Sequence, residues 1–279
     1  MRELLDQGRL LTVPGCSDAL GAALIEQAGF EVVYMSGFGT SATLLGQPDV
    51  GLLTGSEMVD NARRVAAATT LPVIADGDTG YGNPVNVMRT VRDYERAGVA
   101  AIQLEDQVAP KRCGHMTDKQ VVPLAEMVAK VRAAAEARDE MLIIARTDAR
   151  APEGLAAAIE RAHAYVEAGA DLLFVEALES VDEFAAIAAE PLGVPLVFNW
   201  VEGGRSPALS TSEVAELGYR VLLLPISLLL AATAAMQQTL RDISTLGTPS
   251  IDPATDPFAD FTTMIGLPQV LDIQHRFAD

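Results

Sequence analysis

The chain has 279 residues, of which 49% are hydrophobic, and its 20 Lys and Arg against 38 Asp and Glu give a formal net charge of −18. This apolar content excludes a disordered chain, and the acidic balance argues against proteins that bind nucleic acid or anionic membranes through clustered cations. Its two cysteines, Cys16 and Cys113, are too sparse for a disulfide scaffold or a structural zinc site. We expect a cytoplasmic protein, because neither a signal peptide nor an apolar run of roughly 20 residues is apparent.

Short apolar runs recur along the chain, and each is followed by a polar or Gly-rich segment and then by an Ala-rich helical pattern. The candidate strands are 11–13, 32–35, 73–75, 101–104, 142–145, 172–175, 196–198 and 221–224. The helical patterns between them are 18–28, 56–69, 84–97, 124–137, 155–168, 181–189 and 212–217. Runs that are apolar throughout indicate strands buried on both faces, and alternation with helices indicates parallel pairing. The chain is therefore predicted to be an α/β protein with a (β/α)8 TIM barrel, and a doubly wound open sheet is the alternative.

The composition changes after Gly247, where a segment rich in Pro and Asp precedes a final helix-like piece. We predict a (β/α)8 catalytic barrel over 1–247, and a linker with a C-terminal helix over 248–279. Such an appendage packs either against a neighbouring subunit or back on its own barrel.

Polar groups follow six consecutive strands of the predicted barrel, at the end where barrel active sites form. In chain order they are Ser36-Gly37, Asp76-Gly77-Asp78, Glu105-Asp106, Arg146-Thr147-Asp148, Glu176 and Asn199. Any one of them fits a solvated loop, but six in succession predict a functional site.

Three of these groups predict a metal ion. Asp76, Asp78 and Glu105 lie at neighbouring strand ends, and three carboxylates repel one another unless a hard cation lies between them. Mg2+ or Mn2+ is favoured over zinc, because neither His nor Cys is adjacent. The alternative is that one Asp caps the following helix, and the segment Asp78-Thr79-Gly80 resembles a turn.

A second cluster, Lys111-Arg112-Cys113-Gly114-His115, lies in a polar loop. Its cations should lower the pKa of the Cys113 thiol below the free value of about 8.5 and make it a usable acid, base or nucleophile. Gly114 gives the loop freedom to close over a ligand. The alternative is a basic surface loop with an exposed cysteine, but concentrated cations in so acidic a chain indicate an anionic substrate.

These motifs, together with Tyr34-Met35-Ser36-Gly37 and 45–49 (Leu-Gly-Gln-Pro-Asp), resemble the isocitrate lyase/phosphoenolpyruvate mutase superfamily from Val13 to about Gly247. The stretch 199–207 resembles the branch of this superfamily that contains carboxyphosphonoenolpyruvate mutase, 2,3-dimethylmalate lyase and 2-methylisocitrate lyase. It resembles 2-methylisocitrate lyase less than the other two enzymes. The resemblance implies a barrel fold, Mg2+, and α-hydroxy or α-keto acid substrates. It also implies a homotetramer that exchanges C-terminal helices.

The resemblance implies binding roles for the matching residues. Asp78 would be the nearest metal ligand, with metal-bound waters held by Asp76, Asp49 and Glu105. The resemblance also implies the residues that bind the substrate. The backbone of Ser36, Gly37 and Phe38 would receive the α-keto acid end, and Arg146 would pair with the substrate carboxylate. Glu176 and Asn199 would form the polar floor, and Gly114 completes the set.

The implied catalytic group is Cys113, which would exchange a proton with the carbanion carbon. Lys111 and His115 would support it on the loop, and Tyr34 would lie near the reacting hydroxyl. Arg146 would act beside them by pairing with the substrate carboxylate.

Three departures from the family pattern narrow the range of expected substrates. Leu230 and Phe258 stand where lyases of tricarboxylates carry Arg, and Phe38 stands where many relatives have Gly. An unpaired buried charge costs several kcal/mol, so we expect a smaller or more apolar acid, such as oxaloacetate or an alkylmalate.

We therefore expect a Mg2+-dependent C–C lyase that releases an α-keto acid such as pyruvate through an enolate-like intermediate. The alternatives are a P–C phosphonomutase of the carboxyphosphonoenolpyruvate type and a barrel that binds a keto acid without turnover.

Overall fold

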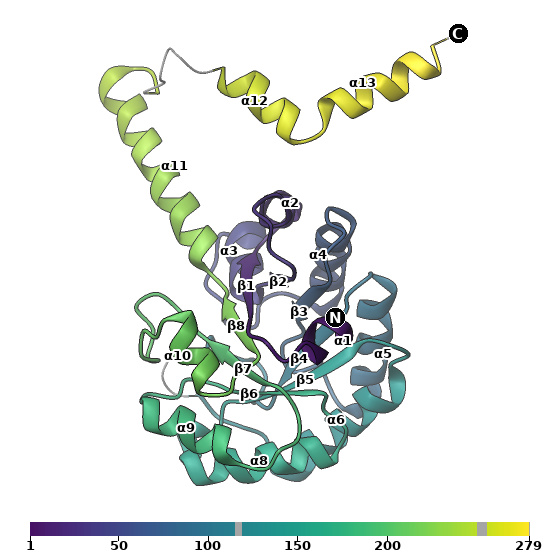
Figure 1. Cartoon of the computed structure of the whole chain (residues 1–279), viewed down its shortest axis with the longest axis vertical. Coiled ribbons are helices and arrows are strands. Elements are labelled where there is room, and N and C mark those ends of the chain that lie inside the picture. The colour runs from purple at the N-terminus through teal and green to yellow at the C-terminus, as the bar shows by residue number, and fades with distance from the viewer. Residues whose placement is uncertain (115–118, 250–255, 279) are drawn as a thin grey trace. The chain divides into compact units, whose positions relative to one another are not determined.

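Eight parallel strands close a barrel in the order β1 to β8 in the computed structural model, which describes residues 1–114, 119–249 and 256–278 (Figure 1). The strands are β1 (Leu11–Cys16), β2 (Val33–Met35), β3 (Val73–Asp76), β4 (Ala101–Glu105), β5 (Leu142–Thr147), β6 (Leu172–Val175), β7 (Leu196–Asn199) and β8 (Val221–Leu224). Closure is made by β1 and β8, where Leu11 pairs with Val221 and Pro14 with Leu224. The predicted (β/α)8 barrel is confirmed, and the open sheet is wrong.

Helices surround the barrel. They are α1 (Arg2–Asp6), α2 (Ala19–Gln27), α3 (Gly37–Leu45), α4 (Gly55–Ala67), α5 (Pro84–Arg96), α6 (Leu124–Ala137), α7 (Arg150–Glu153), α8 (Leu155–Glu167), α9 (Val181–Ala189) and α10 (Thr211–Glu216). The sequence patterns did not predict α3, because its residues GFGTSATLL contain glycine and threonine without a clear apolar stripe. The Ser36 side chain nevertheless starts this helix by accepting a hydrogen bond from the Gly39 amide.

The strands are apolar throughout because both of their faces are buried. One face fills the barrel interior, where Val13, Ile74 and Leu172 are all inaccessible to solvent. The other face packs against the helices, as Val33 and Ala75 do. Tyr34 and Phe174 belong to the interior cluster and also line the cavity at the carboxyl ends of the strands.

The chain divides into two compact units, Met1–Leu229 and Leu230–Asp279, and the division falls inside the long helix α11 (Ser227–Leu246). The final helix-like piece forms two helices, α12 (Pro257–Met264) and α13 (Leu267–Arg276), because Gly266 adopts a left-handed conformation between them. The boundary after residue 247 and the exchange of C-terminal helices stay predictions. Over the described ranges, no helix has both the length and the apolar content needed to cross a bilayer.

Candidate functional site

A cavity of about 210 Å³ lies at the carboxyl ends of the barrel strands. Most of the predicted site residues line it: Tyr34, Ser36, Phe38, Asp49, Asp76, Glu105, Lys111, Cys113, Gly114, Arg146, Glu176 and Asn199. Apolar side chains complete the wall: Phe174, Val201, Pro225 and Ile226. Gly37 and Asp78 lie directly behind this lining, and His115 falls outside the described residues.

Lys111 joins two of the predicted metal ligands. Its Nζ lies 2.7 Å from the Asp49 carboxylate and 2.8 Å from Asp78 Oδ1, and the lysine side chain is buried. Burial lowers the pKa of Lys111, but the surrounding carboxylates, Asp78 foremost, raise it well above the usual value. The ammonium therefore stays charged and balances the acidic cluster, a contact that sequence reasoning did not predict.

The Asp76–Asp78 segment is a turn rather than an extended strand end. Asp78 has a positive φ of 48°, and the Gly80 amide donates to the Gly77 carbonyl at 3.0 Å. The alternative that one Asp caps the next helix is wrong, because α5 is capped by Asn83. The turn instead lets the Asp78 amide donate to Asp76 Oδ1 at 3.1 Å, which keeps both carboxyl groups at the same strand end.

Asp76 is buried beneath the start of α3. A Cβ at Gly37 would overlap Asp76 Oδ2, so only glycine fits this close approach. Burial raises the pKa of Asp76 to about 6, although Lys111 acts in the opposite direction. Burial likewise raises the pKa of Glu105 well above the usual range, against the influence of Arg146.

The donor set at these strand ends fits a hard cation. Asp78 Oδ1 is buried, and within the described part of the chain its charge is met by the Lys111 ammonium at 2.8 Å, without the geometry of a hydrogen bond. No group of three or more His, Cys, Asp or Glu side chains converges as a ligand cluster among the described residues. Mg2+ needs only one or two direct carboxylates and keeps several waters, so the oxygen donors around Asp78 match Mg2+ better than zinc.

Arg146 lines the cavity and is buried. Its guanidinium forms two bonds to the Asp148 carboxylate, at 2.9 and 3.0 Å, and lies 3.3 Å from Glu105 Oε2. Glu176 Oε1 is 3.7 Å from Nη2, and the Phe174 ring centroid is 5.0 Å from the guanidinium carbon. This packing fixes the orientation of the guanidinium at the cavity.

The Lys111–Gly114 segment is held at the cavity by the Gln107 side chain, for which no role was predicted, and by the backbone of Asp49. Gln107 accepts a hydrogen bond from the Arg112 amide at 3.0 Å and donates to the Arg112 carbonyl at 2.7 Å. The same Nε2 donates to Glu105 Oε1 at 3.0 Å, and the Cys113 amide donates to the Asp49 carbonyl at 3.2 Å. Gln107 directly follows Glu105-Asp106 in the sequence, at the start of the loop.

The two cysteines differ in environment, and neither is in a disulfide. Cys113 is partly exposed at the cavity, and the lowered pKa of its thiol stays a prediction. Cys16 ends β1 and is buried. Burial raises the pKa of the Cys16 thiol to about 12.

The remaining predicted residues, Tyr34, Glu176 and Asn199, each form a hydrogen bond with another polar side chain. The Tyr34 hydroxyl donates to Gln103 Oε1 at 3.5 Å, and burial raises the pKa of Tyr34 well above the usual value. Asn199 Nδ2 donates to Glu176 Oε2 at 3.3 Å. Asn199 Oδ1 is buried and accepts no hydrogen bond from the residues that the structure describes.

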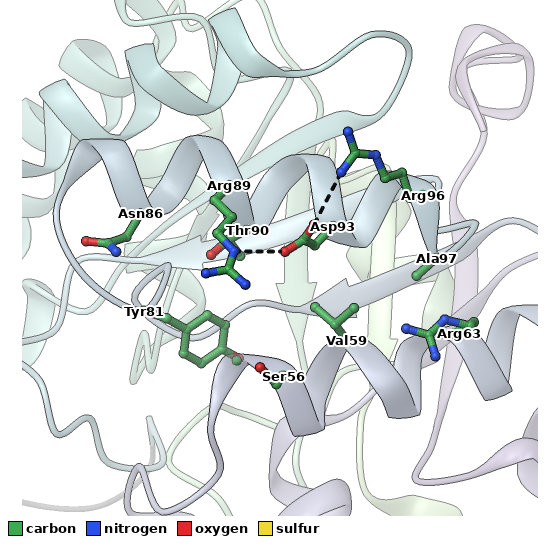
Figure 2. Close-up of a pocket in the computed structure, with 11 residues that line it drawn as sticks. Ser56, Val59, Arg63, Tyr81, Asn86, Arg89, Thr90, Asp93, Arg96 and Ala97 are labelled. Atoms are coloured by element: carbon green, nitrogen blue, oxygen red, sulfur yellow. Dashed lines mark hydrogen bonds and ion pairs between the residues drawn. The ribbon is translucent and has the colours of Figure 1, made fainter.

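A second cavity, of about 490 Å³, lies between α4 and α5 (Figure 2). Its charged residues form exposed ion pairs, with Asp93 3.4 Å from Arg89 and 3.6 Å from Arg96. None of the predicted site residues lines it. The strand-end cavity is therefore the candidate functional site.

The chain matches one protein family and is similar to several known proteins. Residues 1–244 match the model of the family described as phosphoenolpyruvate phosphomutase. The chain is 46% identical to a 2,3-dimethylmalate lyase of Eubacterium barkeri, over 100% of this chain and 97% of that protein. An oxaloacetate acetylhydrolase with bound 3,3-difluorooxalacetate is 37% identical with a TM-score of 0.94, over 99% of this chain and 95% of that one. A phosphonopyruvate hydrolase solved with oxalate and Mg2+ is 33% identical with a TM-score of 0.90, over 100% and 98%.

Proposed function

The chain belongs to the phosphoenolpyruvate phosphomutase family and is a carbon–carbon lyase of the isocitrate lyase/phosphoenolpyruvate mutase superfamily, and we propose that its substrate is a small 2-hydroxy or 2-keto diacid. An alkylmalate or oxaloacetate fits this description, and cleavage would release an α-keto acid such as pyruvate through an enolate-like intermediate. The observation that carries the proposal is the buried Arg146 guanidinium at the floor of a small cavity with apolar walls.

The size and lining of the cavity support a compact diacid. Arg146 is the cation of the floor, and Phe38 and Ile226 are among the apolar side chains of the wall. Such walls favour an alkyl substituent over a third carboxylate, because an unpaired buried charge costs several kcal/mol. Leu230 and Phe258 lie in the second compact unit, so the absence of cations there stays a prediction about specificity.

In this proposal Asp78 would hold Mg2+ directly, and Asp76, Asp49 and Glu105 would hold its water ligands. When bound, Mg2+ supplies Lewis-acid stabilisation of negative charge that develops on substrate oxygen. Mn2+ has the same preference for oxygen donors.

Substrate binding falls to two parts of the chain in the proposed mechanism. Arg146 pairs with a substrate carboxylate. The backbone of Ser36, Gly37 and Phe38, at the start of α3, receives the α-keto acid end, because amides at a helix N-terminus favour an anion. Glu176 and Asn199 complete the polar floor.

Proton transfer falls to the loop. Cys113 acts as general acid or base toward the carbanion carbon, with Gly114 beside it and with Lys111 and His115 in support. Tyr34 lies near the reacting hydroxyl, and its raised pKa keeps it as a hydrogen-bond donor at neutral pH. We also expect a cytoplasmic homotetramer, as in the family pattern.

A coupled assay for pyruvate and glyoxylate tests the proposal over a panel of 2-hydroxy and 2-keto diacids, with and without Mg2+. We expect turnover of an alkylmalate or oxaloacetate that requires Mg2+, and the loss of Mg2+ stimulation in Asp78→Ala. A variant still stimulated by Mg2+ would mean that another residue is the ligand.

The same assay separates the two alternatives. A phosphonomutase would form a phosphonate visible by 31P NMR while no malate analogue releases a keto acid. A non-catalytic barrel would bind pyruvate or oxalate but convert no member of the panel.

A further inference from the structure

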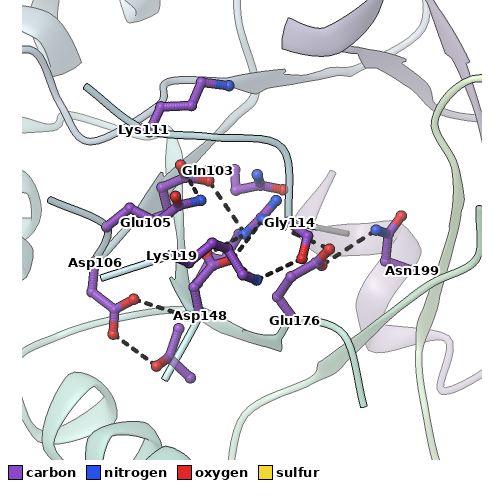
Figure 3. Close-up of polar contacts among 12 residues, drawn as sticks. Gln103, Glu105, Asp106, Lys111, Gly114, Lys119, Asp148, Glu176 and Asn199 are labelled. Carbon is purple, nitrogen blue, oxygen red and sulfur yellow. Dashed lines mark hydrogen bonds and ion pairs between the residues drawn. The ribbon is translucent and has the colours of Figure 1, made fainter. Parts of the chain in front are cut away.

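Lys119 is a buried cation that none of the roles above uses. Its side chain is 1% exposed, and its Nζ donates to the Gly114 carbonyl at 2.6 Å and to Asp148 Oδ1 at 2.7 Å (Figure 3). A buried ammonium is costly unless its partners compensate for the lost hydration. These two short, charge-assisted bonds are therefore the interactions that keep Lys119 at this position.

The Asp148 end of this contact is rigid. The Asp148 carboxylate also holds Arg146 through two hydrogen bonds, and its backbone amide donates to Asp106 Oδ1 at 2.8 Å. Asp106 is itself fixed by the hydroxyls of Thr147 and Tyr165, each at 2.7 Å. Burial alone would raise the pKa of Asp148, but its ion pairs with Arg146 and Lys119 lower it below the usual value, so Asp148 stays charged.

The Gly114 end lies directly on the floor of the cavity. A Cβ at Gly114 would overlap Glu176 Oε1 and Arg146 Nη2, so the backbone here touches the groups proposed to bind substrate. Cys113 immediately precedes this glycine and lines the same cavity. The Gly114 carbonyl is thus a point from which the position of Cys113 can be controlled.

We propose that Lys119 is a positioning residue, whose ammonium joins the Gly114 carbonyl to Asp148 and thereby fixes the backbone of Gly114, the residue that follows Cys113, against Arg146. The arrangement makes Asp148 a shared support for two functions. Both oxygens of its carboxylate accept hydrogen bonds from the guanidinium and orient it for the substrate, and Oδ1 also holds, through Lys119, the backbone of Gly114 next to the thiol. This inference rests on the proposed function for its kinetic consequence only.

Alkylation of Cys113 by iodoacetamide tests the positioning without any substrate. Cys16 is buried, with a pKa of about 12, so Cys113 is the thiol expected to react in the folded protein. Lys119→Met removes both hydrogen bonds while it keeps the apolar stem, and we expect Cys113 to be alkylated at least about five-fold faster, because the peptide is no longer held.

Lys130 provides a matched control. It is also a buried lysine, but it lies in α6, with Glu126 and the Thr79 carbonyl as its partners. We expect alkylation within about two-fold of wild type in Lys130→Met. An unchanged rate in Lys119→Met, or an equal increase in both variants, would overturn the inference.

Kinetics supply the second readout. We expect Lys119→Met to lower kcat by about 10- to 100-fold with KM within about three-fold, because the thiol is misplaced while Arg146 still binds substrate. A KM effect without a kcat effect would contradict the positioning role. If Lys119→Met does not fold, Lys119→Gln keeps a neutral donor and is tested in the same way. If no diacid is turned over, the proposed function fails, while the alkylation rates still decide the role of Lys119.

Discussion

The strand-end cavity and the cavity between α4 and α5 each have an ion pair of Arg and Asp, and the two pairs differ in burial. Between α4 and α5, Arg89 and Asp93 are 81% and 35% exposed, and each charge keeps much of its hydration. At the strand ends, Arg146 and Asp148 are 9% and 0% exposed. Exposed pairs contribute at most about 1 kcal/mol, whereas a buried charge that loses its partner is strongly destabilising.

This difference in burial shows which charges lose hydration free energy when the chain folds. The acidic cluster around Lys111 and the pairs of Arg146 lose hydration that a surface position would preserve. An all-apolar barrel end of similar volume would be as stable or more so. The buried charges are therefore better explained by ligand chemistry than by stability.

The largest effect is expected at Arg146. Arg146→Met leaves Glu105 and Glu176 without their guanidinium partner, and we expect the free energy of unfolding to fall by about 3–5 kcal/mol. Lyase activity should fall by at least about 1,000-fold, because the substrate carboxylate loses its ligand. Urea unfolding and initial rates measure the two losses, and near-normal activity would remove Arg146 from substrate binding.

Cys113→Ser separates chemistry from stability at the same cavity. Since Cys113 is only partly buried, the melting temperature should stay within about 2 °C of wild type. We expect kcat to fall by about 100- to 10,000-fold, because a hydroxyl is a far poorer acid or base than a thiol. Calorimetry and the keto acid assay provide both values, and an unchanged kcat would exclude Cys113 from proton transfer.

The raised pKa of Asp76 predicts that the free energy of unfolding of the metal-free protein depends on pH. Its pKa is about 6 in the folded chain against an ordinary value of 3.8, so the folded state binds the extra proton between these values. Stability contributed by the protonated group is present below about pH 4 and is lost as the pH rises through about 6. Asp76→Asn stays neutral, so with EDTA present it should be more stable than wild type by about 3 kcal/mol at about pH 8.

That advantage should disappear near about pH 4, where wild-type Asp76 is itself protonated. Unfolding in urea at both pH values provides the comparison. An equal difference at the two pH values would show that burial does not shift this carboxyl group.

The smallest effect is expected in the cavity between α4 and α5. Arg89→Met breaks an exposed pair with Asp93, and we expect the free energy of unfolding to change by less than about 0.5 kcal/mol. Lyase activity should match wild type, because none of the candidate site residues lines this cavity. A large loss of stability or activity would remove the distinction between the two cavities.

Much of the fold was predictable because its signals are local. Eight apolar runs alternating with helical patterns predicted the barrel, and the polar groups that follow the strands predicted where the site lies. Helix α3 was missed, since its start depends on one Ser36 hydrogen bond and its sequence lacks a regular stripe.

The sequence by itself thus determined the barrel and the identity of the charged groups at its carboxyl end. Only the tertiary structure decided which groups are partners: Lys111 with Asp49 and Asp78, and Lys119 with Asp148. Residues 62 or 29 positions apart become neighbours through strand register and loop packing, which no local periodicity encodes. Burial then sets the pKa values and the energetic cost of each charge, because both depend on lost hydration rather than on residue type.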